Sequence, residues 1–196
     1  MVRNLLFAML LLALATPAAG QSDPDKAFDG PRIAPPVERA SLPTAGSRPR
    51  VTSEIRLGDR APDFELQDAT GARVRLKSFR GQWVALFFVD RRDAVPPLGA
   101  VQRDLGARGI RVVAVCAEKP SALRRMLSEH PTDVVALSDP MSDVAALYGL
   151  FDSTHNMTRP GFVLLDIDGT VKLVIMGQTL PPKDVTRIVQ YAVDGL

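Results

Sequence analysis

The fold of this chain is decided by the stretch "VALFFVDRRDAVPPLGAVQRDL", which runs from Val84 to Leu105. It opens with a continuous apolar run that ends at Val89, which is typical of a strand covered on both faces of a sheet. A polar loop and two prolines follow. Pro97 suits the first turn of a helix, because the missing N–H of proline is not needed there. Val101 and Leu105 then recur at helical spacing, so the stretch predicts a buried strand followed by an amphipathic helix.

Four further segments continue the alternation of strand and helix. The run "IRVVAVCAE" predicts a second buried strand that reaches Cys116, and the next helix is expected from Pro120 to His130. Val134–Leu137 predicts a short strand. The run "SDVAALYG" predicts a helix that stops at Gly149, because glycine is a common helix terminator. Strands that alternate with helices in this way form a largely parallel sheet.

A hairpin is predicted at each end of this core. The segment "DFELQDATGARVRLKSF" holds two short alternating runs, Phe64–Leu66 and Val74–Leu76, around a polar turn. The segment "GFVLLDIDGTVKLVIMG" holds two strands joined by a tight Asp168-Gly169 turn, and a last helix is expected from about Pro182. The sequence therefore predicts an α/β fold with a central, mostly parallel sheet, an N-terminal hairpin, a C-terminal antiparallel hairpin and helices on both faces.

The working site of an open α/β sheet lies beyond the carboxyl ends of its strands. In this chain, that rule selects the loop after Val89, the loop after Cys116 and the turn before Phe162. Functional residues are therefore expected in these three places.

The composition indicates one compact domain with additional N-terminal segments. The chain has 196 residues, of which 46% are hydrophobic, and its formal net charge is +2. A chain of this size buries a substantial core. Nucleic-acid binding is not expected, because it needs a concentrated basic face. The doublets Arg91-Arg92 and Arg124-Arg125 are too short to supply one.

Residues 1–20 are expected to be a secretory signal peptide. Arg3 supplies the positive start, an apolar run from Leu5 to Ala15 follows, and small residues precede Gln21. The alternative is an uncleaved membrane anchor, but spanning a bilayer takes about 20 apolar residues and this run is shorter. We expect a periplasmic or secreted protein without a membrane anchor. Its single cysteine, Cys116, excludes an intramolecular disulfide.

The segment Gln21–Ser53 is expected to be a flexible tether, and the folded domain is expected to cover residues 54–196. The tether contains six prolines and shows neither the periodicity of a strand nor that of a helix. A docking arm is the alternative interpretation of the same composition.

Three phrases that follow one another along the chain carry a resemblance to a known family. They are "LGDRAPDFELQDATGARVRLKSFRGQWVALFF", "LSDPMSDVAALYGLF" and "RPGFVLLDIDGTV", and they extend from about Leu57 to Val171. Together they resemble the peroxiredoxin family, which includes alkyl hydroperoxide reductases and thiol-specific antioxidant proteins. The resemblance implies a thioredoxin-like fold. It also implies a redox scaffold in which a cysteine at a helix N-terminus attacks peroxide as a thiolate.

The reactive cysteine that the resemblance implies is absent. The usual family pattern is Thr-Pro-x-Cys near the start of the first helix, where this chain has Val95-Pro96-Pro97-Leu98. A shift of the alignment by one residue places Pro97 at the cysteine position instead. Thioredoxin-like reductases of the exported type carry Cys-Pro-Pro-Cys at this place. Neither alignment leaves a nucleophile, and Ala94 or Val95 replaces the threonine that polarises the peroxide.

Two residues remain as candidates for a catalytic role. Arg159 aligns with the arginine that lies near the thiolate in the family, and pairing with a surface carboxylate is the alternative. Cys116 ends a strand at the rim of the expected site, where it is a candidate for a relocated thiol. The alternative is that Cys116 is simply a small apolar residue of the core.

No cofactor and no metal are predicted. Neither His130 nor His155 has a partner at metal-ligand spacing. Asp166 and Asp168 flank a hairpin turn, so that general acid–base catalysis is not expected from them.

Three functions are left open by these observations. The first is a redoxin-type protein that has lost its thiol chemistry and acts by binding. A partner protein is one candidate for what it binds. The second is a thiol oxidoreductase that uses Cys116 and needs an external partner for recycling. The third is a structural interaction module reached through the tether.

The Arg159-Pro160 peptide bond separates two branches of the fold. Thioredoxin-fold redox proteins commonly carry a cis-proline just before the strand that faces the active-site helix. Peroxiredoxins usually have no proline there, and their arginine motif works with a trans bond. A trans bond at Pro160 would therefore group the chain with the peroxiredoxins. Gly161 is expected to allow a close backbone approach beside this bond.

Overall fold

The structure is a computed structural model that describes residues 55–195. The expected signal peptide and the expected tether lie outside the described residues. Within the described part, none of the helices is long and apolar enough to cross a membrane.

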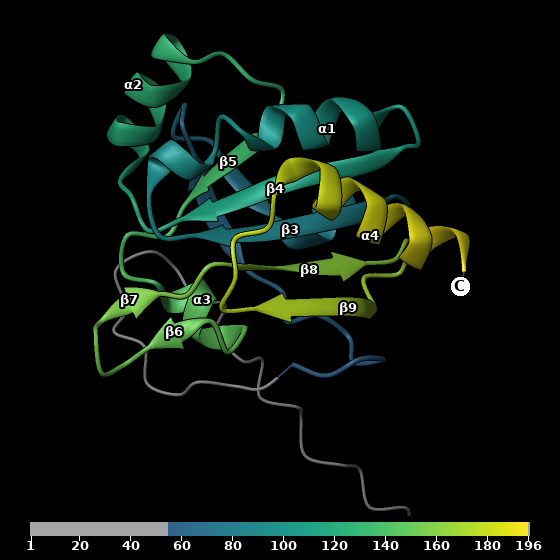
Figure 1. Ribbon diagram of the computed structural model, residues 1–196. Coiled ribbons are helices and arrows are strands. Elements are labelled where there is room, and N and C mark those ends of the chain that lie inside the picture. The colour runs from purple at the N-terminus through teal and green to yellow at the C-terminus, as the bar shows by residue number, and fades with distance from the viewer. Residues whose placement is uncertain (1–54, 196) are drawn as a thin grey trace, which may run out of the picture. The chain divides into compact units, whose positions relative to one another are not determined.

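A seven-stranded sheet, in the order β2-β1-β5-β4-β3-β8-β9, forms the centre of the domain (Figure 1). A second, two-stranded sheet is formed by β6 and β7. The strands are β1 Glu65–Asp68, β2 Arg73–Arg75, β3 Trp83–Val89, β4 Ile110–Cys116, β5 Val135–Ser138, β6 Phe151–Asp152, β7 Met157–Thr158, β8 Gly161–Leu165 and β9 Val171–Met176. The helices are η1 Leu76–Phe79, η2 Arg92–Ala94, α1 Leu98–Gly106, α2 Pro120–Glu129, α3 Asp143–Leu147 and α4 Pro182–Asp194.

The parallel pairing expected at the centre of the sheet is confirmed. β3 runs parallel to β4, with Val89 opposite Cys116, and β4 runs parallel to β5. Both predicted hairpins are antiparallel: β1 pairs with β2, and β8 pairs with β9. These hairpins join the parallel core through antiparallel contacts, β1 to β5 and β8 to β3.

Two hydrophobic cores cover the two faces of the sheet, because side chains alternate along each buried strand. On β4, Val112, Ala114 and Cys116 face the core beneath α1, α2 and α4. Val113 and Val115 face the other core, to which α3 contributes. The expected arrangement of helices on both faces is therefore confirmed (Figure 1).

Tyr148 connects the core on the α3 side of the sheet to the start of the domain. Its fully buried ring packs against Phe64 and Phe88, with centroid distances of 6.1 Å and 5.1 Å. Its hydroxyl donates a 2.6 Å hydrogen bond to the carbonyl of Pro62. This bond joins the end of α3 to the segment that leads into β1.

Replacing Tyr148 by phenylalanine is expected to lower the free energy of unfolding by about 1–2 kcal/mol, because the carbonyl of Pro62 loses its donor in a partly buried setting. Tyr191 offers a matched control, since its side chain is 82% exposed. Tyr191→Phe is expected to change stability by less than about 0.5 kcal/mol. Urea unfolding of the three proteins measures both values. Equal stabilities for the two variants would contradict the assigned role of Tyr148.

Three local features differ from the sequence expectations. Leu76, expected at the end of a strand, is the first residue of the 3-10 helix η1. Pro97 is the N-cap of α1 and not a residue of its first turn, since α1 begins at Leu98. The β6–β7 hairpin was not predicted, because strands of two residues are too short to show any periodicity. The expected stop of α3 is confirmed: the helix ends at Leu147, and Gly149 has a positive φ of 74°.

Candidate functional site

Two hollows open beyond the carboxyl ends of the central strands, where the sequence places the working site. Asp90, the residue after β3, lines both of them. The first hollow lies between the start of α1 and the Pro160-Gly161 turn, and Leu98 forms part of its wall. Its floor includes the rings of Phe87 and Phe162, which stack at 5.0 Å. Its volume of about 50 Å³ has room for no more than roughly a few water molecules.

The start of α1 forms the side of the first hollow where the family's sulfur would lie. Val95 is fully buried in the core, and Leu98 is almost fully buried. The backbone N–H groups of Leu98, Gly99 and Ala100 donate to the carbonyls of residues 95, 96 and 97 at 3.0, 2.9 and 3.3 Å. These are donors that a helix N-terminus otherwise offers to an anion. The start of α1 therefore lacks a nucleophile, and the first backbone N–H groups of α1 already have hydrogen-bond acceptors within the chain.

Cys116 lies in the core and not on a surface of the site. Its side chain is fully buried beneath α1 and α2, in the same core as Val89 and Leu123. Burial raises the pKa of the Cys116 thiol to about 12, and the negative charges of Glu118 and Asp90 act in the same direction. A neutral thiol is a poor nucleophile, because the thiolate is the reactive form. The surroundings of Cys116 thus disfavour thiol chemistry at neutral pH.

Arg159 pairs with a carboxylate on the β6–β7 hairpin. Its Nη2 lies 3.2 Å from Oδ2 of Asp152, and its side chain is 55% exposed. Nδ1 of His155 lies 3.0 Å from the same oxygen. Hydrogen bonds, first that from His155, hold the pKa of Asp152 well below its usual range. Arg159 is therefore held by a surface carboxylate, which is the alternative that the sequence left open.

The Arg159-Pro160 bond is trans, since the described residues contain no cis peptide bond. This outcome groups the turn with the peroxiredoxins. The close approach expected at Gly161 is confirmed. A Cβ atom added there would overlap the carbonyl oxygen of Ile175.

The carboxylate of Asp166 holds the turn of the C-terminal hairpin. Oδ1 of Asp166 accepts hydrogen bonds from the backbone N–H groups of Asp168 and Thr170 at 3.0 Å and 2.8 Å. Within residues 55–195, no group of three or more His, Cys, Asp or Glu side chains is placed to hold a metal ion.

The second hollow, which we call the methionine hollow, is larger, with a volume of about 720 Å³. It lies between Asp90, the turn that carries Met141 and the β6–β7 hairpin, which contributes Met157. Its lining also contains Ser142 and Thr158, whose hydroxyl oxygens are 2.8 Å apart. The sequence alone did not predict a site at these residues. The only signal was the cluster of turn-forming residues in "LSDPMSD".

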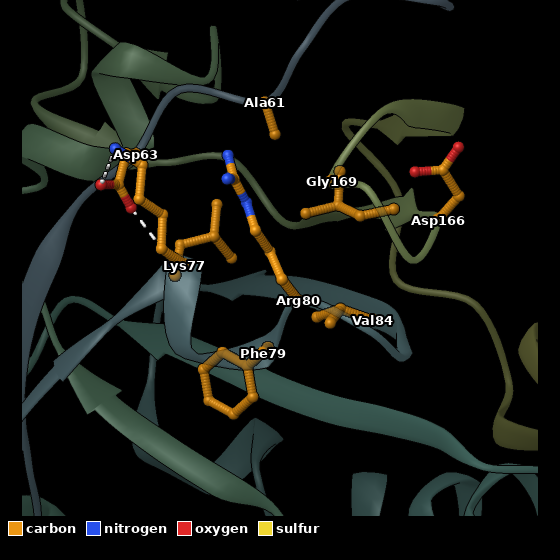
Figure 2. Close-up of a pocket in the computed structure, with 10 residues that line it drawn as sticks. Ala61, Asp63, Lys77, Phe79, Arg80, Val84, Asp166 and Gly169 are labelled. Atoms are coloured by element: carbon orange, nitrogen blue, oxygen red, sulfur yellow. Dashed lines mark hydrogen bonds and ion pairs between the residues drawn. The ribbon is translucent and has the colours of Figure 1, made fainter.

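A third hollow, shown in Figure 2, lies at the opposite end of the sheet, beside the start of β3. Lys77 pairs with Asp63 at 3.1 Å on one side, and the side chain of Arg80 extends across the opening toward Ala61. Its volume of about 20 Å³ holds about one water molecule, so it is not a ligand site of useful size.

Comparisons with known proteins agree with this geometry. The AhpC/TSA family model matches residues 57–174. Peroxiredoxin Bcp of Escherichia coli (strain K12) is 28% identical over 138 residues, which cover 61% of this chain and 85% of the relative. The crystal structure of peroxidoxin BcpB from Mycobacterium tuberculosis has a TM-score of 0.63 at 19% identity, and the match covers 71% of this chain and 97% of that one. AhpC of Enterococcus faecalis has a TM-score of 0.62 at 18% identity, with 70% and 92% covered.

The fold is that of a thioredoxin-like protein, as the structural likenesses show. The chain belongs to the AhpC/TSA family and is related to the thiol peroxidases known as peroxiredoxins.

Proposed function

We propose that this chain is an exported peroxiredoxin-like protein that lacks thiol peroxidase activity and acts by binding. The observation that carries the proposal is the start of α1. Val95, Pro96, Pro97 and Leu98 occupy the place of the reactive cysteine and its neighbours, and no nucleophilic side chain is among them.

The backbone of the same helix start supports the proposal. A peroxidatic site needs donors that stabilise a thiolate and the oxygens of the peroxide. Proline has no N–H, which removes two donors at Pro96 and Pro97. The next three amides are bonded to carbonyls of the same turn. Loss of the sulfur is thus accompanied by loss of the anion-stabilising groups around it.

The alternative, a thiol oxidoreductase that uses Cys116, is less well supported. Such an enzyme exposes its thiol to the substrate and stabilises the thiolate. The Cys116 side chain is fully buried, and its pKa is raised to about 12. The structural module reached through the tether stays an open proposal, because the tether lies outside the described residues.

Export is proposed from residues 1–20. We expect the mature chain to begin near Gln21 and to be found in the periplasmic or culture fraction when the full-length gene is expressed in its own host. N-terminal sequencing of that material measures this outcome. A cytoplasmic chain that retains Met1 would contradict export without affecting the proposal about α1.

Titration of Cys116 separates binding from residual thiol chemistry. In the folded protein at pH 8, we expect a chromogenic aromatic disulfide to react with Cys116 far more slowly than it does in guanidinium chloride. Fast reaction in the folded state, with an apparent pKa below the ordinary thiol value of 9.0, would favour the oxidoreductase.

The raised pKa of Cys116 also predicts how the stability of the protein depends on pH. The folded-state pKa of Cys116 lies above the ordinary value, so the folded state retains its thiol proton to a higher pH than the unfolded state does. The contribution of this group to stability is fully present below about pH 9 and is lost as the pH rises toward about 12. Cys116→Ala is expected to show a smaller loss of stability over that range, measured by urea unfolding. Identical slopes for the two proteins would contradict the raised pKa.

A further inference from the structure

Part of the wall of the methionine hollow is apolar and adaptable. Met141 and Met157 are 41% and 43% exposed, and Phe151 also lines the hollow. Exposed methionines are uncommon, and their unbranched thioether chains adjust to ligands of different shapes. The volume of about 720 Å³ lies within the range of roughly 300–1,000 Å³ that is typical of small-molecule sites.

Polar groups are placed at one side of the hollow. Ser142 is 6% exposed and Thr158 is 3% exposed, and their hydroxyls share one hydrogen bond of 2.8 Å. Each hydroxyl has one donor and two acceptor positions, so the pair keeps hydrogen-bonding capacity for a ligand. An apolar wall with a few fixed polar groups is the usual composition of a ligand pocket.

The backbone is strained at the same place. Ser142 has a φ of 57° and Asn156 a φ of 52°, and these are the non-glycine residues with positive φ in the part of the chain that the structure describes. Both line the methionine hollow. Strained backbone positions cluster at functional sites, since the surrounding structure must hold them in place.

The charges around the hollow cancel locally. The charged residues that line the hollow are Asp90 and Arg91, and Nε of Arg91 lies 3.8 Å from the Asp90 carboxylate. The lining of the hollow therefore carries no unpaired charge. A site for phosphate or another anion is instead lined by cations without partners.

We infer that the methionine hollow binds a small uncharged amphipathic molecule, in which an aliphatic chain packs between Met141 and Met157 and a hydroxyl or carbonyl group bonds to Ser142 and Thr158. The inference rests on the proposal that the chain acts by binding, and it places the ligand away from the start of α1. The apolar chain supplies most of the binding free energy, and the hydroxyl pair fixes the orientation.

The probe is 1-octanol, titrated into the full-length mature protein labelled with ¹³C at the methionine methyl groups. Saturable shifts are expected for the methyl signals of Met141 and Met157. Met176 is an internal control, because it is 41% exposed on β9 and does not line this hollow. Met126 is a second control in the core. Met→Leu variants assign the signals. Equal, unsaturable shifts of all exposed methionines would overturn the inference.

Two further comparisons test the chemistry of the ligand. Thr158→Val is expected to weaken 1-octanol binding about fivefold, which corresponds to one net hydrogen bond. Thr179→Val is the matched control, since Thr179 lines only the first hollow, and it should leave the affinity unchanged. If Thr158→Val does not fold, Met157→Ala removes an exposed wall and is expected to weaken binding as well. An unchanged affinity in folded Thr158→Val overturns the placement of the hydroxyl group, and an unchanged affinity in Met157→Ala overturns the placement of the aliphatic chain.

Octanoate has the same chain length as 1-octanol with a charged head group. It is expected to bind more weakly, because Arg91, the arginine that lines the hollow, is already paired with Asp90. Equal or tighter binding of octanoate would overturn the uncharged class. Failure of both probes refutes this site alone, whereas peroxidase turnover would refute the proposed function and leave the binding data intact.

Discussion

Gly161→Ala is expected to lower the free energy of unfolding by more than about 3 kcal/mol. The added methyl group would overlap the carbonyl oxygen of Ile175 and lie 3.0 Å from Cδ2 of Leu150. Real Cβ atoms essentially never approach a neighbour closer than 3.0 Å. The overlapping atom on β9 belongs to the backbone. The steric overlap can therefore be removed only if β8 and β9 separate at the edge of the first hollow.

Gly81→Ala is the control for this substitution. Gly81 has a φ of +89° and no atom within 4 Å of an added Cβ, so alanine meets backbone strain there without a clash. Its cost is expected to be about 1–2 kcal/mol. Chemical unfolding of the two variants separates strain from steric overlap. If Gly161→Ala cost no more than Gly81→Ala, the close approach of β8 and β9 would be contradicted.

Asp139→Ala is expected to have an effect of similar size, about 3–5 kcal/mol, because it leaves three buried N–H groups without an acceptor. The Asp139 carboxylate accepts hydrogen bonds from the backbone N–H groups of Asp143, Val144 and Ala145 at 2.9, 3.0 and 3.0 Å. The side chain is 1% exposed. These bonds hold the start of α3 in place. They also hold the turn that contains Ser142, which lines the methionine hollow.

Asp139→Asn provides the matched comparison, since the amide oxygen still accepts part of this set. We expect it to be less destabilising than Asp139→Ala when both are unfolded in urea at neutral pH. Equal losses would show that the space filled by the side chain, and not its hydrogen bonds, holds α3.

Asp139 is also expected to affect how the stability of the protein depends on pH. Burial raises the pKa of Asp139 to about 6; the charge of Asp143 also raises it, while the three N–H bonds oppose the rise. The folded state therefore keeps this proton up to a higher pH than the unfolded state, whose value is near 3.8. Stability from this group is present below about pH 4 and is lost as the pH rises to about 6. Asp139→Asn should remove that part of the slope.

The main elements of the fold were predictable because their periodicity is strong. The continuous apolar run of β3 and the spacing of Val101 and Leu105 on α1 leave little choice of structure. The Asp168-Gly169 turn fixes the β8–β9 hairpin, because its glycine takes a φ of 79°. These signals are local, and the topology then follows from the rules for joining strands and helices.

The network around α3 was not predictable from local rules. A helix that begins at Asp143 after Ser142 would be assigned Ser142 as its capping side chain. In the structure, Ser142 bonds to Thr158, and Asp139 supplies the acceptor for the first amides. Both contacts depend on how the turn folds back and on the β6–β7 hairpin, which are properties of the assembled domain.

The candidate site was predictable in what it lacks and not in what it contains. The absence of a nucleophile at residues 95–98 is visible in the sequence. The bonding of the first α1 amides to carbonyls of the same turn, and the capture of Arg159 by Asp152, need coordinates. A sequence shows which side chains are present, whereas the partner of an arginine or an amide depends on distance.

Peroxide consumption by the purified mature protein tests the loss of chemistry at α1 most directly. The assay combines hydrogen peroxide or an alkyl hydroperoxide with a thiol reductant and compares the protein with its Cys116→Ser variant. The expected result is that both proteins consume peroxide no faster than the reductant alone, because neither the start of α1 nor the buried Cys116 supplies a thiolate. Turnover at rates typical of enzymes, abolished by Cys116→Ser, would contradict the proposal and identify Cys116 as the nucleophile.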